Sequence, residues 1–187
     1  MAVVLLLFAA SSGCTGPQES AARLTSLELA GMLLEEADLP ENFTFVEKEK
    51  VSEEEMPPED LERGIRERYN LKFARVQGNS SQNTTVIDQY IFCCSTDKIE
   101  ELVTKPLVSN EYATYEVLPD PGIGNSSVAY RVTTTYTGAD GNSSEQEVSY
   151  MIKFCKLDIY EILYLHGEPA EYDLLRDAAV KAEVKIR

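Results

Sequence analysis

Residues 128–165 read VAYRVTTTYTGADGNSSEQEVSYMIKFCKLDIYEILYL, and this stretch decides the fold. Its first run alternates, with Tyr130 and Val132 on one face and Arg131 on the other, which is the period of two of a half-buried strand. An Asp-Gly pair follows, and glycine accepts the positive φ of a tight turn. The second run, VSYMIKF, alternates again, whereas the third, IYEILYL, is apolar on both faces. The stretch therefore predicts a three-stranded antiparallel meander whose third strand is covered on both sides.

Helix and strand signals flank this meander. A capping box at Thr25 and Glu28 begins a helix whose apolar residues keep helical spacing as far as Ala37. From Pro169 onwards an apolar stripe is typical of a helix laid across a sheet. About six or seven strands, mostly in one antiparallel sheet with flanking helices, place the chain in the α+β class, with the C-terminal helix packed on the sheet. The other elements expected are strands at 43–50, 65–73, 84–94 and 112–118 and helices that begin at Pro57 and Ser95.

The N-terminus carries an export signal of the lipoprotein kind. Residues 2–10, AVVLLLFAA, are too few to cross a bilayer about 30 Å thick as a helix, but they match the apolar core of a signal peptide. Small residues lead from them to Cys14, a pattern that resembles the lipobox of prokaryotic lipoproteins, whose cysteine becomes the lipidated N-terminus. An uncleaved apolar tail is the alternative. We therefore divide the chain into a signal peptide with lipobox at 1–13, a tether at 14–24 and a single α+β domain at 25–187.

Charge argues against nucleic acid as a partner. The chain has 32 Asp and Glu against 17 Lys and Arg, a net charge of −15, whereas a protein that binds a phosphate backbone needs a cationic surface. The sequence has no phosphate-binding glycine loop, nucleophile elbow or dinucleotide motif, so no cofactor is expected. His166 is the sole histidine and has no nucleophile beside it in the sequence. Among so many carboxylates, a catalytic pair cannot be told from surface acids.

Short Asn-x-Ser/Thr motifs recur in the predicted turns. Gly-Asn-Ser-Ser occurs three times, at 78–81, 124–127 and 141–144. Gly and Asn both accept left-handed backbone angles, so turn chemistry is one explanation. The motifs are also acceptors for N-glycosylation, which we favour because five of the seven Asn residues fall in them. Together with the lipobox, glycosylation indicates an archaeal cell surface. The candidate acceptors are Asn42, Asn79, Asn83, Asn125 and Asn142.

Three cysteines lie within the predicted domain, and three interpretations of them are open. Cys93 and Cys94 are adjacent in a strand and point to opposite faces, so both cannot reach one partner. Cys155 could form a disulfide with either of them if its strand lies next to theirs, and an extracytoplasmic site would permit the bond. Buried free thiols are favoured over this bond. A metal site that adds His166 is disfavoured because no CxxC or HxxxH spacing occurs, so no metal is expected.

Several short motifs resemble one family. The leader SGCTG, ADLPENF at 37–43, PDPGIGNSS at 119–127 and the closing helix at 173–186 look like parts of uncharacterised surface lipoproteins of methanogenic archaea. The loop at 119–127 is the most specific of these motifs. The order of strands and helices is also similar to that of PsbP-like domains. The resemblance implies an envelope location and carries no known active site.

Two functions are open at this point. We favour an extracytoplasmic, lipid-anchored and non-catalytic envelope protein at the cell surface, which binds an unidentified protein or small molecule through the loop-bearing edge of its sheet. If the loops carry glycans, the expected contact surfaces lie near Tyr69, Tyr112 or the acidic loop at 53–55. The alternative is a cell-surface hydrolase that uses carboxylates. A buried pair of acids converging on a pocket would favour the hydrolase, and its absence would favour the binding protein.

Overall fold

The computed structural model describes residues 26–76, 84–94, 96–137 and 144–187. These residues form one sheet of seven strands, which four α-helices and two short 3-10 helices accompany. The strands are β1 (Thr44–Val51), β2 (Ile65–Val76), β3 (Thr84–Cys94), β4 (Ala113–Val117), β5 (Ser126–Thr137), β6 (Ser144–Lys156) and β7 (Ile159–Gly167). The helices are α1 (Ser26–Gly31), η1 (Glu36–Asp38), η2 (Glu53–Glu55), α2 (Pro58–Glu62), α3 (Thr96–Thr104) and α4 (Tyr172–Lys185).

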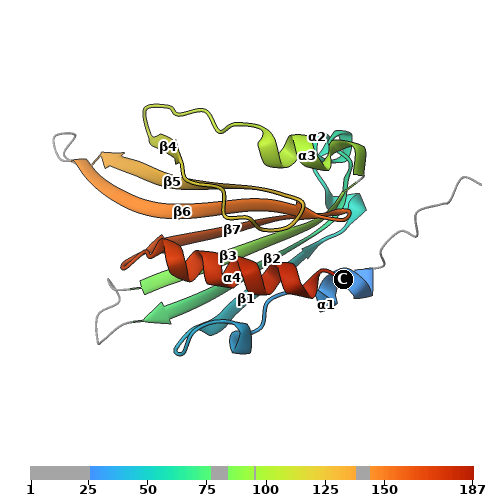
Figure 1. The fold of residues 1–187 in the computed structure, drawn as a ribbon, viewed down its shortest axis with the longest axis horizontal. Helices are drawn as coiled ribbons and strands as arrows, with labels where there is room; N and C mark the ends of the chain where they lie inside the picture. The colour runs from blue at the N-terminus through green and yellow to red at the C-terminus, as the bar shows by residue number, and fades with distance from the viewer. Residues whose placement is uncertain (1–25, 77–83, 95, 138–143) are drawn as a thin grey trace, which may run out of the picture.

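The sheet has the order β1-β2-β3-β7-β6-β5-β4, and every neighbouring pair is antiparallel. Strands β5, β6 and β7 form the predicted meander, and β7 lies at the centre of the sheet (Figure 1). Strand β3 pairs with the other side of β7, so the two halves of the chain meet at this central strand. The edges are β1 and β4. The expected α+β class, with a mostly antiparallel sheet, is confirmed.

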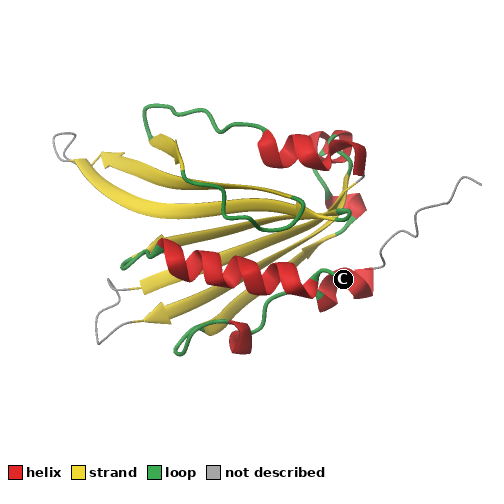
Figure 2. Ribbon diagram, viewed as in Figure 1, coloured by secondary structure: helices red, strands yellow, loops and turns green. Residues whose placement is uncertain are grey.

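Helix α4 crosses one face of the sheet (Figures 1 and 2). It packs over β6 and β7, and its buried side chains include Leu175, Ala178 and Ala182. Alanine side chains let the helix axis approach the sheet closely. Leu29 of α1 and Leu33 beyond it belong to the same apolar core. The predicted packing of the C-terminal helix on the sheet is confirmed, and we call this side of the sheet the α4 face.

Helix α3 covers only one end of the opposite face, which we call the α3 face. Its Ile99 and Val103 join a second apolar cluster with Tyr160 of β7 and Cys155 of β6. Strand β7 is therefore buried on both faces at this end, since Leu163 faces the α4 core while Tyr160 faces α3. The prediction that the third strand of the meander is covered twice is confirmed.

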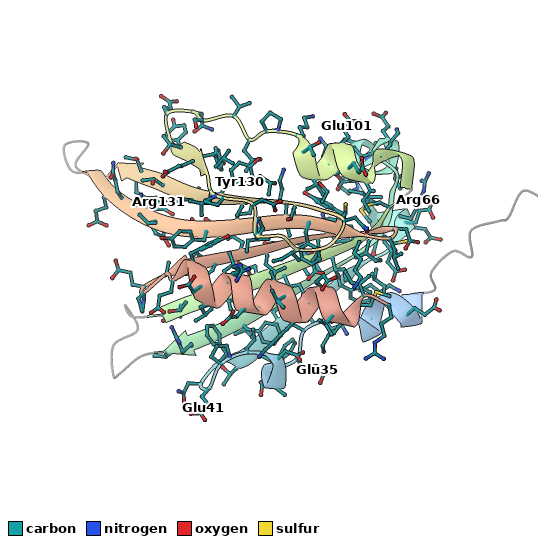
Figure 3. The ribbon with its side chains drawn as sticks, in the orientation of Figure 1. Glu35, Glu41, Arg66, Glu101, Tyr130 and Arg131 are labelled. Atoms are coloured by element: carbon teal, nitrogen blue, oxygen red, sulfur yellow. The ribbon has the colours of Figure 1, made fainter. Side chains whose placement is uncertain are left out.

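A buried lysine fastens the end of α3 to the sheet. Lys153 is 4% exposed, and its Nζ donates to the carbonyl oxygens of Leu102 at 3.3 Å and Lys105 at 3.0 Å. The ammonium lies 5.5 Å from the ring centroid of Tyr130, which Figure 3 labels beside its exposed neighbour Arg131. The last carbonyls of a helix lack partners within it and carry partial negative charge, so a cation suits them. Burial lowers the pKa of Lys153.

The expected length of the first helix is wrong. Helix α1 ends at Gly31 instead of continuing towards Ala37, because the chain turns onto β3, where the Leu34 amide donates to Oε1 of Gln89 at 2.9 Å. Tyr69, near which a contact surface is expected, is itself only 5% exposed and lies beneath lysine side chains of β1. No helix of the described residues is long and apolar enough to cross a membrane.

Candidate functional site

The part of the α3 face beyond α3 carries a group of polar and aromatic side chains. Alternation along the strands brings them to one face, and register brings them side by side. Lys72, Asp88 and Tyr164 are direct neighbours across β2, β3 and β7. We call the following six side chains the open-face cluster: Lys72, Asp88, Tyr90, Ser149, Tyr164 and His166.

Asp88 and His166 make the central contact of the open-face cluster. Nε2 of His166 lies 3.0 Å from Oδ2 of Asp88, and the imidazole is 33% exposed. Nζ of Lys72 lies 4.0 Å from the other oxygen, Oδ1. The carboxylate of Asp88 is mostly buried, and a buried charge needs such partners because it has lost its water. The contact therefore fixes the imidazole at the surface of the sheet.

Tyr164 is held between His166 and Ser149. Its ring stacks on the imidazole, with 5.3 Å between centroids and 27° between planes. Its hydroxyl lies 2.6 Å from Oγ of Ser149, and either oxygen can be the donor. Ser149 is 1% exposed, so it supports the phenol from below and cannot itself reach a ligand. These two contacts leave the Tyr164 ring little freedom to move.

Both half-buried phenols of the cluster are hydrogen-bond donors at neutral pH. Burial raises the pKa of Tyr90, and the neighbouring Asp88 carboxylate adds to this effect. Burial also raises the pKa of Tyr164, although its bond to Ser149 opposes the change. A phenol whose pKa exceeds its usual value of about 10 keeps its proton throughout the physiological range. The cluster can therefore offer O–H donors beside aromatic faces.

A cavity of about 150 Å³ adjoins the cluster between β1, β2 and β3. Two exposed carboxylates of β1, Glu47 and Glu49, stand on its outer side. Nδ2 of Asn70 donates to Oε2 of Glu49 at 2.7 Å, which orients that carboxylate. We call this cavity the acidic hollow; its lining is Glu47, Glu49, Asn70, Leu71, Lys72, Asp88 and Tyr90.

The geometry of the open-face cluster fits recognition better than covalent catalysis. A serine nucleophile needs a hydrogen bond to its base. Here Oγ of Ser149 bonds to the Tyr164 hydroxyl, while the imidazole of His166 bonds to Asp88. The part of the chain that the structure describes also holds no group of three or more His, Cys, Asp or Glu side chains that could bind a metal ion.

The buried acids do not converge. Of the described residues, Asp88 and Glu161 are the buried carboxylic acids. Asp88 lies on the α3 face, whereas Glu161 alternates with Ile159 and Leu163 on the α4 face, where Nε2 of Gln89 donates to its Oε1 at 2.6 Å. The two acids thus lie on opposite faces of the sheet, so the arrangement expected of a carboxylate hydrolase is not found among these residues.

Most of the cluster was missed by sequence reasoning. The one member singled out from the sequence was His166, and its partner Asp88 lies 78 positions away, on a strand that reads as apolar on both faces. The available signal was the polar pair of Asp88 and Gln89 inside this strand. Burying two polar side chains without partners is unfavourable, so such a pair indicates hydrogen-bonding partners on each face of the strand.

The candidate modification sites fall into two groups. Cys14, Asn79, Asn83 and Asn142 lie outside the described residues. Asn42 is exposed, has a φ of 75° and lies two residues before β1. Asn125 is also exposed, but its Oδ1 accepts the Leu157 amide at 3.1 Å. Both Asn42 and Asn125 are therefore surface residues, and Asn125 in addition holds a turn together.

No disulfide joins Cys93, Cys94 or Cys155 to another of these three cysteines in this structure. Cys94 and Cys155 share the apolar cluster under α3, whereas Cys93 packs against the α4 core. Strand β7 lies between β3 and β6, and two strand spacings amount to about 9–10 Å, which exceeds the roughly 7 Å that a disulfide spans between Cα atoms. The strand order thus weighs against the bridge from Cys155, which thiol titration of the unfolded, unreduced protein tests directly.

Comparison with known proteins adds evidence about the fold. No protein-family model matches the chain, and no curated protein matches it. The chain is similar in structure to the extracellular domain of PknH from Mycobacterium tuberculosis, with a TM-score of 0.60 over 87% of this chain and 97% of that one. The two sequences are 12% identical, so the likeness shows a shared fold alone.

Proposed function

We propose that the protein is a non-catalytic binding domain of the cell envelope, held at the outer side of the membrane by a lipid on Cys14, which recognises its ligand with the open-face cluster. The observation that carries this proposal is a set of half-exposed rings, Tyr90, Tyr164 and His166, beside fixed polar groups. Ligand sites commonly combine aromatic surface with a few placed polar groups. Rings already fixed by their neighbours lose little freedom when a ligand binds.

The envelope location rests on the chain's leader and on its motifs. The apolar run before Cys14 supports export and lipidation, and the Asn-x-Ser/Thr motifs support glycosylation at an archaeal cell surface. The similar PknH domain is itself described as extracellular, which agrees with an extracytoplasmic place for this fold. One lipid-modified residue is a sufficient tether only if it carries two chains.

A binding test can use the isolated cell envelope of the native host as the probe. The full chain, with Tyr90→Ala or His166→Ala, should lose envelope binding by about tenfold, because one aromatic contact is typically worth about 1.4 kcal/mol or more. Tyr112→Ala, a change of a tyrosine that is 62% exposed and directly precedes the far edge strand β4, is the control. Unchanged binding by both cluster variants, with thermal unfolding intact, would refute the proposed site.

The anchor is tested separately from the site. In the native host the wild-type protein should partition with membranes, and Cys14→Ser should release it to the soluble fraction. Intact-mass measurement should then give a chain that begins at residue 14 and carries the lipid. An unmodified chain that still begins at Met1 would rule out lipidation and leave the binding proposal to stand on the envelope assay.

A further inference from the structure

Strand β1 is bare on both faces. Its residues 44–50 are all exposed and only Val51 is buried. An edge strand of a packed sheet normally buries one of its faces. Phe45 and Val46 are nevertheless 47% and 53% exposed. In the described sheet β1 pairs with β2 alone, so its outer edge presents backbone N–H and C=O groups.

The opposite edge of the sheet is closed by its own loop. Oδ1 of Asn110 accepts the Ala113 amide of β4 at 2.9 Å, and the Asn110 amide donates to the Ala113 carbonyl at 2.9 Å. Oγ of Ser109 accepts the Tyr115 amide at 3.0 Å. On β1 a comparable contact occurs at the Phe45 end, where Oε1 of Glu36 accepts the Phe45 amide at 2.7 Å. Residues 46–51 lie beyond this contact.

A second copy of the chain fits the β1 edge poorly. Glu47 and Glu49 lie on the α3 face, and Lys48 and Lys50 lie on the α4 face. Two copies related by a two-fold axis would join antiparallel β1 strands with the same faces aligned. That pairing places Glu opposite Glu and Lys opposite Lys, and like charges directly opposite are destabilising.

The two faces of β1 border two different cavities. On the α3 face lies the acidic hollow, with Glu47 and Glu49 at its outer side. On the α4 face lies a second cavity of about 320 Å³, which we call the apolar hollow. In a strand added to β1, successive side chains would point alternately to these two faces. The lining of the apolar hollow is Ala30, Leu33, Leu34, Glu35, Glu36, Phe45, Lys48, Leu71 and Phe73.

We propose that the outer edge of β1 is the docking site for an extended segment of a partner protein, which adds to the sheet as a further strand and alternates basic with apolar side chains. Its basic side chains would face Glu47 and Glu49. Its apolar side chains would lie on the α4 face, beside Phe45, the apolar hollow and the apolar stems of Lys48 and Lys50. In strand addition the backbone bonds supply affinity and the pockets for alternate side chains supply specificity. The net charge of −15 favours the approach of a basic segment. This site adjoins the open-face cluster, because Lys72, Asp88 and Tyr90 also line the acidic hollow.

The probe is a blocked octapeptide, KVKVKVKV, added to the full chain. Binding should protect from hydrogen exchange those amides of residues 46–51 that point away from β2, and it should shift their NMR signals. A peptide with one central proline, KVKPKVKV, keeps the charge but loses a backbone donor and cannot lie as a regular strand. It should bind about tenfold or more weakly. The acidic peptide EVEVEVEV should not bind.

Matched protein variants locate the contact. Glu47→Gln with Glu49→Gln should weaken binding of KVKVKVKV several-fold, whereas Glu54→Gln with Glu111→Gln, which removes the same charge from exposed positions elsewhere, should leave it unchanged. If the proline peptide bound as tightly as KVKVKVKV, binding would result from charge attraction alone, and the proposal would be overturned. Lack of new protection in β1 at millimolar peptide would overturn it as well. So would protection of the amides of β1 that point away from β2 before any peptide is added, since the outer edge would then already be occupied.

Discussion

At the scale of single residues, Glu161 is the most unusual side chain of the core. It is fully buried on the α4 face, and burial raises the pKa of its carboxyl to about 8 from an ordinary 4.5, although the bond from Gln89 opposes this change. Its Oε1 accepts from Gln89, while Oε2 has no hydrogen-bond partner among the described residues. Gln89 in turn accepts the Leu34 amide, so the pair joins two strands to the segment after α1. A neutral, protonated carboxyl is the form that this environment favours.

The first prediction concerns the pH dependence of stability. Because the folded pKa of Glu161 is raised, the folded protein holds a proton that the unfolded chain releases above about pH 4.5. The free energy of unfolding should therefore fall as the pH rises from 4.5 to about 8 and then level off. Glu161→Gln removes this titration and should stabilise the protein by on the order of a few kcal/mol at pH 8, with little effect near pH 4. Urea unfolding across this range measures it.

The control for this prediction is an exposed acid. Glu101→Gln on the outer side of α3 removes one carboxylate from the surface and should leave the shape of the pH curve unchanged. If the curves of the wild type and Glu161→Gln run parallel from pH 4 to 9, then Glu161 is ionised in the fold. Its buried oxygen must in that case have a partner that compensates the charge, such as a buried water.

At the scale of elements, α3 depends on Lys153. The helix has nine residues, too short to be stable alone, so its contacts with the sheet decide whether it forms. Lys153→Met keeps the apolar stem but removes the donor to the carbonyls of Leu102 and Lys105. We expect the free energy of unfolding to fall by about 2 kcal/mol, the usual loss for hydrogen bonds from a charged donor.

A matched lysine is available on α3 itself. Lys98 also donates to a carbonyl oxygen, that of Glu62, but its side chain is exposed and water can replace the bond. Lys98→Met should therefore change stability by no more than about 0.5 kcal/mol. Chemical denaturation gives both values, and hydrogen exchange of the Leu102 to Lys105 amides reports the local effect. Equal losses for the two variants would show that burial of Lys153 adds nothing.

The elements themselves were largely readable from the sequence. The strand at 84–94 was predicted with the bounds that the structure gives β3, because turn residues precede it and a helix start at Ser95 follows it in the sequence. Helix α1 was predicted too long. The chain leaves the helix to bond the Leu34 amide to Oε1 of Gln89, and Gln89 lies 55 positions away in the sequence. Periodicity is a local signal and does not contain such a contact.

The open-face cluster could not be read from the sequence for the same reason. Asp88 and His166 become neighbours only through the pairing of β3 with β7, and strand order is not a property of either segment alone. The short length of α3, which leaves part of this face without a helix, was visible in the sequence, but where the helix would lie was not. The site therefore forms only when the strand order of the sheet brings these residues together.

At the scale of the whole molecule, attached glycans and bound partners compete for the same molecular surface. Strands β2 and β5 end, and strands β3 and β6 begin, at the end of the sheet opposite α3 (Figure 1). Asn42 precedes the edge strand β1, and Asn125 precedes β5. Which of these motifs is modified thus decides which surfaces stay accessible. A large glycan on Asn42 would crowd the Phe45 end of the β1 edge.

The last prediction ranks the two motifs that the structure describes. An acceptor needs a reachable Asn and the hydroxyl two residues after it. In the motif of Asn125 the hydroxyl of Ser127 donates to Oδ1 of Asp120 at 2.6 Å and accepts the Ile123 amide at 3.1 Å. The bond from Ser127 also lowers the pKa of Asp120, so the carboxylate persists at all but acid pH. In the folded loop the Ser127 hydroxyl, which the glycosylation motif requires, is therefore already engaged in hydrogen bonds.

Asn42 has a more accessible motif, because its Thr44 lies on the bare strand β1 and makes one weaker bond, to the Ala74 carbonyl at 3.2 Å. Glycopeptide mass spectrometry of native protein should accordingly find higher occupancy at Asn42 than at Asn125. Asp120→Ala frees the Ser127 hydroxyl without touching the motif and should raise the occupancy of Asn125 relative to Asn42. High occupancy of Asn125 in the wild type, unchanged by Asp120→Ala, would mean that the glycan is attached before the loop folds, and the folded geometry would then have no part in selecting the site.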